Sequence, residues 1–130
     1  MPYKAQDYAP SNSIITFPQL TATGRTDHIE LLSHDGLMYW SSALFVATIA
    51  GMTTSVDIIL EGSLDGINWF YLSNDDDAIN YTADGTYALR WEGTGEINFI
   101  RFYFETETGG TAATIDVVAK IFGPKGANRP

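Results

Sequence analysis

Apolar and polar residues alternate with a period of two along much of this chain. Successive side chains of a strand point to opposite faces, so this period predicts strands that each bury one face. The clearest examples are residues 97–106 and 111–122, and residues 56–61 carry a similar pattern. The alternation predicts a core that contains Val56, Ile58, Leu60, Ile100, Phe102, Phe104, Ile115 and Val117.

The segment Leu37–Ile49 departs from this alternation because it is apolar on both sides. Its length and apolarity alone would also allow a buried helix. The segment is rich in β-branched and aromatic residues, and the break at Ala50-Gly51 follows it directly. These features favour a central strand that turns into the next one.

An Asp-Gly pair lies between the strand patterns of residues 56–61 and 67–72. This arrangement is a strong hairpin signal, since glycine accepts the positive φ of a tight turn, and serine and aspartate side chains bond nearby backbone donors. We expect the tryptophan just past the bend to cap the edge of the sandwich. The residues assigned to this turn are Ser63, Asp65, Gly66 and Trp69.

A second pair, Asp84-Gly85, separates residues 78–82 from residues 86–92. The same turn chemistry predicts a second hairpin at this point.

Together these patterns predict an all-β protein with eight or nine short strands, joined by Gly- and Asp-rich turns. No segment shows a convincing amphipathic helix, so the expected fold is an antiparallel β-sandwich, jelly-roll-like in its arrangement. Residues 1–13 are polar and predict an extended N-terminal arm, and residues 14–122 form the sandwich domain. Gly123-Pro124 is expected to end the last strand, which leaves residues 123–130 as a polar C-terminal tail.

The chain carries sixteen acidic and seven basic residues, a net charge of −9. This balance argues against nucleic-acid binding, which requires basic patches that neutralise phosphates. Residues 5–119 contain all sixteen acids and three bases, a net of −13, so basic charge is concentrated at the ends. The longest apolar stretch, residues 37–52, is too short and too polar to span a bilayer, and no signal peptide is predicted.

Candidate catalytic chemistry is sparse. His28 and His34 are the two histidines, and neither lies in a nucleophile, metal-protease or phosphate-loop motif. His34 precedes Asp35-Gly36 and is interpreted as a turn residue. Clustered oxygen ligands make residues 74–77 the best calcium candidate, but the loop lacks the glycine and glutamate of an EF-hand. We therefore predict no enzymatic activity, no metal and no cofactor.

Three segments resemble small β-sandwich virion proteins of tailed bacteriophages. They are residues 56–72, with the pattern Ser-x-Asp-Gly-x-x-Trp, residues 81–90, and residues 100–102 followed by 109–117. The resemblance covers roughly residues 43–122. It implies a structural protein of the virion: a capsid decoration, or cement, protein that clamps neighbouring capsid subunits, or alternatively a tail or neck component. It carries no catalytic residues over to this chain.

The resemblance also implies the protein's surroundings. The partners would be the major capsid protein or other virion proteins, and the location would be the capsid surface of the virion, after synthesis in the host cytoplasm. Closed symmetry is usual for such modules, so we expect a homo-oligomer, taken here as a trimer. Outward aromatic side chains of the last two strands and the basic ends suggest contacts with these partners. The candidate contact residues are Lys4, Phe99, Tyr103, Phe122, Lys125 and Arg129.

Carbohydrate binding is an alternative, because Ser-x-Asp-Gly-x-x-Trp also occurs in discoidin-like and other carbohydrate-binding sandwiches. Exposed aromatic side chains lying side by side would favour it, whereas buried ones would favour a structural protein. The candidate stacking residues are Trp40, Trp69, Trp91 and Tyr71.

Overall fold

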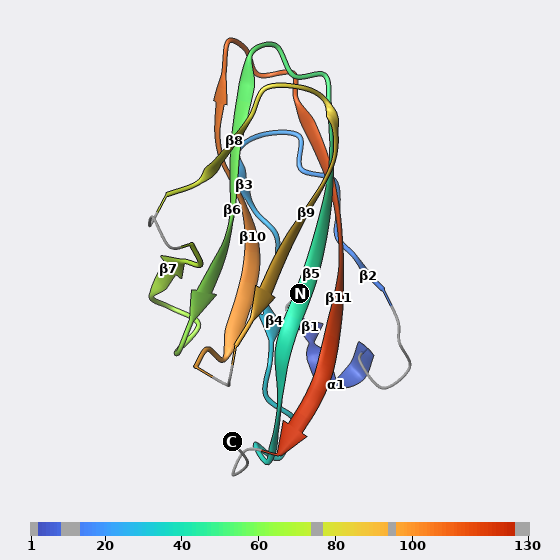
Figure 1. The fold of residues 1–130 in the computed structure, drawn as a ribbon, viewed down its shortest axis with the longest axis vertical. Helices are drawn as coiled ribbons and strands as arrows, with labels where there is room; N and C mark the ends of the chain where they lie inside the picture. Colours follow the sequence, from blue (N-terminus) through green and yellow to red (C-terminus); the bar gives the residue numbers. More distant parts are fainter. Residues whose placement is uncertain (1–2, 9–13, 74–76, 94–95, 127–130) are drawn as a thin grey trace.

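The computed structural model describes residues 3–8, 14–73, 77–93 and 96–126, which form two packed β-sheets (Figure 1). The predicted all-β, largely antiparallel sandwich is confirmed. The first sheet contains β1 (Tyr3–Lys4), β3 (Gly24–Arg25), β4 (Ile29–Glu30), β6 (Ser55–Ser63), β7 (Trp69–Tyr71), β8 (Ile79–Tyr81) and β10 (Phe99–Thr108). The second sheet contains β2 (Ile15–Thr16), β5 (Met38–Ala50), β9 (Gly85–Glu92) and β11 (Thr114–Gly126). A short helix, α1 (Ala5–Tyr8), precedes β2, and within the described ranges no helix is long and apolar enough to cross a membrane.

The first sheet has the strand order β1-β4-β10-β6-β7, with β3 also paired to β10 and β8 to β6. The second sheet has the order β2-β11-β5-β9. Among the strands that the structure describes, every pair is antiparallel except β1 with β4. The eleven strands of the described residues exceed the predicted eight or nine, because several are two-residue pairings. Two strands, β5 and β11, are long rather than short, at 13 residues each.

The segment that could have been a helix is strand β5, which lies between β11 and β9. Its side chains alternate between the core and the outer face from Ser42 to Ala50. The strand interpretation is therefore confirmed, and the apolar residues on the two sides of the strand lie in different environments. One set packs into the core, and the other lies on the outside of the second sheet.

The core lies between the two sheets. All eight residues that the alternation placed there are buried, each with no more than 3% of its surface exposed. They come from β6, β10 and β11, so their side chains meet from both layers. The prediction of these core positions is confirmed.

The predicted second hairpin, at Asp84-Gly85, is wrong. Strand β8 pairs with β6 in the first sheet, whereas β9 pairs with β5 in the second sheet, so the two arms belong to different layers. The Asp84 carboxylate instead accepts hydrogen bonds from the backbone N–H groups of Gly51 (3.1 Å) and Met52 (3.0 Å). Asp84 thus holds the β5–β6 connection in place while the chain crosses between the sheets.

The last strand does not end at Gly123-Pro124 as predicted. Pro124 pairs with Trp40, and the strand continues to Gly126, opposite Met38. Strand β2 pairs with β11 at residues 118 and 119 only. In the described residues, the end of β11 around Pro124 is therefore paired on one side, with β5. A proline that lacks an N–H donor is tolerated where one side of a strand is unpaired.

Residues 3–8 differ from the extended arm expected for them, because they form β1 and α1. The Tyr3 N–H donates to the His28 carbonyl at 2.9 Å, and the Tyr3 ring packs edge-on against Phe17, with 5.1 Å between ring centroids. Ala5 is fully buried. Residues 9–13 of the predicted arm and residues 127–130 of the predicted tail lie outside the described residues.

Candidate interaction surfaces

The β6–β7 turn is held by a dense set of local hydrogen bonds, as predicted for its Ser-x-Asp-Gly sequence. Ser63 Oγ accepts from the Gly66 N–H at 2.9 Å and donates to the Asn68 carbonyl at 2.7 Å. Asp65 Oδ1 accepts from the backbone N–H groups of Ile67 and Asn68, both at 2.8 Å. Gly66 has a φ of +76°, which favours glycine. These bonds give the turn one fixed backbone conformation.

The Asp65 carboxylate is the acceptor on which this turn depends. The hydrogen bond from the Asn68 N–H, followed by those from the Ile67 N–H and the Asn68 side chain, holds the pKa of Asp65 well below its ordinary value of 3.8. The ionised form is the one that accepts all these bonds. The turn is therefore fully supported at neutral pH.

Large aliphatic side chains project from this rigid turn into solvent. Leu64 is 61% exposed and Ile67 is 79% exposed, and Phe70 on β7 is also exposed. We call residues 64–68 the hairpin tip. Because the backbone is already ordered, burying these side chains against a partner requires little further loss of conformational entropy. The hairpin tip is thus an exposed apolar surface on a preorganised backbone.

An arginine–aromatic cluster occupies the outer face of the first sheet. Arg25 and Arg101 each direct Nε to Oε1 of Glu61, at 3.1 and 2.8 Å. The Arg101 guanidinium lies 3.8 Å from the centroid of the Trp69 ring, and that of Arg25 lies 3.8 Å from the Tyr103 ring centroid. Glu61 is buried beneath this cluster, so its charge is compensated by two cations. Trp69 lies on β7, which ends the strand order of this sheet, so it is at the sheet edge as expected, and the Arg101 guanidinium covers its ring.

Two further groups extend the cluster along the same face. The Tyr71 hydroxyl donates to the Glu105 carboxylate, and this bond raises the pKa of Tyr71 well above its ordinary value. The His28 ring lies 5.1 Å from the Phe99 ring and 6.0 Å from the Trp69 ring, measured between centroids. Burial lowers the pKa of His28, so the neutral imidazole is favoured near pH 7. The face is thus a packed set of stacked and paired side chains.

The outer face of the second sheet is different, because its centre is apolar. Its strands are aligned in rows that run from β9 across β5 to β11. The apolar row is Ala88–Val46–Val118, the basic row is Arg90–Leu44–Lys120, and the acidic row is Thr86–Thr48–Asp116.

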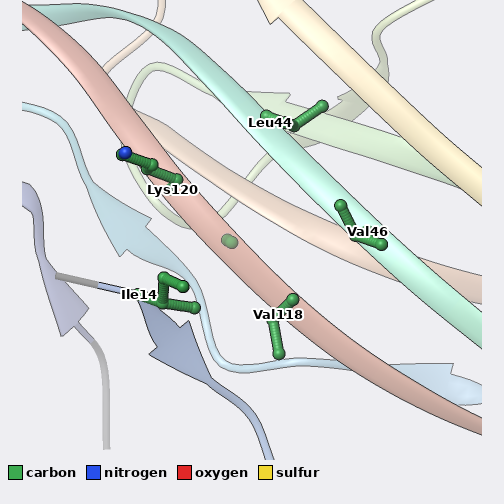
Figure 2. A pocket seen from close by; sticks show the side chains of 6 residues that line it. Ile14, Leu44, Val46, Val118 and Lys120 are labelled. Atoms are coloured by element: carbon green, nitrogen blue, oxygen red, sulfur yellow. The ribbon is translucent and has the colours of Figure 1, made fainter. Parts of the chain in front are cut away.

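A shallow hollow of about 150 Å³ lies over β11 in this face. Figure 2 shows Leu44 and Val46 on one side of β11 and Ile14 on the other, with Val118 and Lys120 projecting from β11 between them. Ile14 is 61% exposed. Leu44, Val46 and Val118 are half-buried, so the hollow is bordered by one exposed and three partly exposed aliphatic side chains, an arrangement typical of a surface that another molecule covers.

The candidate partner contacts from the sequence do not form one surface. Phe99 and Tyr103 lie on the outer face of the first sheet, whereas Phe122 lies on the outer face of the second sheet. Strands β10 and β11, the last two of the chain, belong to opposite layers, so their outward aromatic side chains do not share a face. A flat partner on one side of the sandwich therefore cannot contact all three aromatic rings.

The basic candidates are also separated. Lys4 forms an ion pair with Glu30 of the adjacent strand β4. The backbone of Lys125 pairs with Tyr39 in the second sheet, and Arg129 lies outside the described residues. Contact of these residues with a partner stays a prediction.

The structure does not bring the proposed sugar-stacking residues together. Trp40 and Trp91 are buried in the core, whereas Trp69 and Tyr71 lie on the first sheet. Of this pair, Trp69 is covered by the Arg101 guanidinium, and the Tyr71 hydroxyl is bonded to Glu105. A flat aromatic platform made of all four residues is therefore not present.

The two histidines lie apart: His28 is half-buried among the rings of Phe99 and Trp69, whereas His34 lies on the surface. His34 Nε2 lies 3.2 Å from Asp7 Oδ1, and both side chains are more than half exposed. The hydrogen bond of Leu37 N–H to Asp35 and the positive φ of Gly36 confirm the turn interpretation of this segment. Residues 74–76 of the candidate calcium loop lie outside the described residues. Within the described residues, no group of three or more acidic, histidine or cysteine side chains is arranged around a metal position.

Sequence reasoning missed both the hairpin tip and the apolar row as surfaces. Signals for them were present: Leu64 and Ile67 flank the Asp-Gly pair, where polar residues are usual. The apolarity of β5 on both sides was also a signal, because a strand with one face in the core must then place apolar side chains such as Leu44 and Val46 on the outer face of its sheet.

No protein-family model matches the sequence, and no curated protein matches it. Solved structures of similar fold include the SPBc2 prophage-derived protein YomS, which is 12% identical with a TM-score of 0.54. That match covers 85% of this chain and 92% of YomS. A chain in the structure of Triatoma virus is 8% identical with a TM-score of 0.50, and the match covers 92% of this chain and 67% of that one. At these identities the likeness establishes a shared β-sandwich fold.

Proposed function

We propose that this chain is a structural protein of a bacteriophage virion, and that it decorates the capsid by clamping neighbouring capsid subunits. The observation that carries the proposal is the hairpin tip, where a hydrogen-bonded turn holds Leu64 and Ile67 exposed to solvent. Such a tip suits insertion into a pocket of a protein partner, because apolar side chains on an ordered backbone bury surface with little further loss of conformational entropy. The resemblance of residues 43–122 to small phage virion proteins supports the same assignment.

The fold comparisons add support of a general kind. One similar structure comes from a prophage and another from a virus particle, and both share the sandwich. A tail or neck component of the virion is the second candidate, since the same tip would serve there. If many copies attach to one particle, weak single contacts suffice for lasting attachment, because each bound copy raises the effective concentration of its neighbours at the surface.

Deletion of the N-terminal arm or of the C-terminal tail would not test attachment cleanly, because both deletions also remove contacts that hold the sandwich together. Deletion of residues 1–12 would remove the buried Ala5 and the Tyr3 ring that packs on Phe17, so the sandwich itself would lose stability. Deletion of residues 123–130 would remove paired residues of β11. Substitutions in the exposed hairpin tip leave these contacts intact.

The test is co-sedimentation of the purified chain with particles of its phage that lack it, and separately with purified tails. Leu64 and Ile67 have 61% and 79% of their surface left to bury, and full burial of one aliphatic side chain contributes about 1.5–3 kcal/mol. The two side chains together therefore contribute at least about 2 kcal/mol, so Leu64→Ser with Ile67→Ser should weaken capsid binding about thirtyfold or more. Ile79→Ser is the matched control, because Ile79 is also exposed but lies on β8. Equal binding by the tip variant and the control would overturn the proposal, and binding to tails alone would move the assignment to the second candidate.

A further inference from the structure

The second sheet's outer face is close to neutral on a strongly acidic chain. It carries Arg90 and Lys120 together with Glu92 and Asp116, two bases against two acids, whereas the chain as a whole has a net charge of −9. Two copies of this protein repel each other through most of their surfaces. They meet the least repulsion when these faces approach, and the centre of the face is apolar.

We infer that this face binds the same face of a second copy, related to the first by a two-fold axis that runs across the strands at the apolar row. The inference concerns the purified chain and does not rest on the proposed role in a virion. In this arrangement the apolar row of one copy packs on the apolar row of the other. Leu44 and Val118, which border the hollow, are then covered as well.

Charge selects this axis over the alternative one. A two-fold axis across the strands exchanges the rows on either side of the apolar row, because it reverses the strand direction. Lys120 of each copy then lies opposite Asp116 of the other, which creates two equivalent ion pairs. An axis along the strands would instead place Arg90 opposite Lys120 of the second copy, because both belong to the basic row. Like charges in contact disfavour that alternative.

Both members of the proposed ion pair can accept a new partner. Lys120 Nζ lies 5.5 Å from the centroid of the Phe122 ring, and an ammonium group carries three donors. Asp116 Oδ1 accepts from the Gln19 side chain at 3.1 Å, and a carboxylate has about four acceptor sites. Glu92 lies one row beyond Arg90, at the margin of the contact.

The size of the face is sufficient for a weak, reversible pair. Strands β5, β9 and β11 lie about 4.8 Å apart and each extend about eight residues across the contact, whereas β2 contributes two residues, so the face covers roughly 400 Å² per copy. The total, about 800 Å², is below the ~1,000 Å² of a stable specific interface, which is why we expect the pair to be weak and reversible. The proposed ion pairs are reciprocal only between two copies, so this contact forms a dimer, and the trimer expected above stays a separate prediction.

Charge reversal tests the arrangement by sedimentation equilibrium over a wide concentration range at low salt. The wild-type chain should dimerise reversibly. K120D and D116K should each weaken dimerisation at least tenfold, since each replaces two attractive contacts by two repulsive ones. The double variant K120D with D116K should return to within about threefold of the wild type.

These variants contain their own control. K120D makes the net charge more negative and D116K makes it less negative, so an effect of net charge alone would shift dimerisation in opposite directions. Circular dichroism of each variant confirms that it is folded. A monomeric wild type, an unaffected single variant, or a double variant that fails to recover would each overturn the inference. Particle binding by a wild-type monomer would overturn this pairing and leave the proposed function standing.

Discussion

Replacing Phe102 by alanine is the most direct test of how the two sheets are held together. Phe102 lies in the middle of β10, is fully buried and contacts the core between the layers. Its N–H donates to the Thr26 hydroxyl at 3.1 Å, and its carbonyl accepts from the Thr26 N–H at 3.0 Å. These backbone contacts do not depend on the phenyl ring. The substitution therefore isolates the loss of side-chain packing.

The expected loss is about 3–5 kcal/mol, the range for Phe-to-Ala changes in well-packed cores. A chain of 130 residues has a free energy of unfolding of roughly 7–20 kcal/mol at about 0.05–0.15 kcal/mol per residue. At about 2.1 cal/mol/K of unfolding entropy per residue, the same loss lowers the Tm by about 11–18 °C. The variant should remain folded at 25 °C, with much reduced stability.

Urea unfolding followed by tryptophan fluorescence measures this change, read as a lower midpoint with an unchanged m-value. Tyr103→Ala is the control, because Tyr103 is the next residue of β10 and lies on the outer face against Arg25. That variant should lose no more than about 1 kcal/mol, the value of a partly exposed cation–π contact. A loss below about 1 kcal/mol for Phe102→Ala, or equal losses for the two variants, would refute the assignment of β10's faces.

Two further predictions concern the acidic groups of the first sheet. Glu61→Ala should lower the free energy of unfolding by about 2–3 kcal/mol, because it leaves the Arg25 and Arg101 guanidinium groups without their shared carboxylate; a urea midpoint equal to that of the wild type would contradict this. Asp65→Asn should destabilise the chain at neutral pH, and its difference from the wild type should shrink as the pH falls from about 5 to about 2. The sign follows from the lowered pKa of Asp65: its ionised form stabilises the folded state above the ordinary value of 3.8, and this contribution is lost as the pH falls through the folded pKa. A difference that stays constant over this pH range would show that the carboxylate does not support the turn.

Local sequence determined the strands and the first turn. The alternation in β6, β10 and β11 identified core residues correctly, since each strand must bury one face whatever its neighbours are. The Ser63–Asn68 turn was equally predictable, because its hydrogen bonds join residues no more than five positions apart. Such interactions form from the segment itself.

Tertiary structure decided which strands became neighbours and which side chains shared a surface. Asp84-Gly85 has the same dipeptide as the first turn, yet its carboxylate binds Gly51 and Met52, more than thirty residues earlier in the chain. Phe99 and Phe122 each point outward from their strands, and the pairing of those strands in separate sheets places them on opposite sides. Period-two alternation predicts that a side chain points away from the core. It does not predict on which of the two outer faces of the sandwich that side chain lies. The choice between them comes from strand pairing over long sequence separations, which no local pattern encodes.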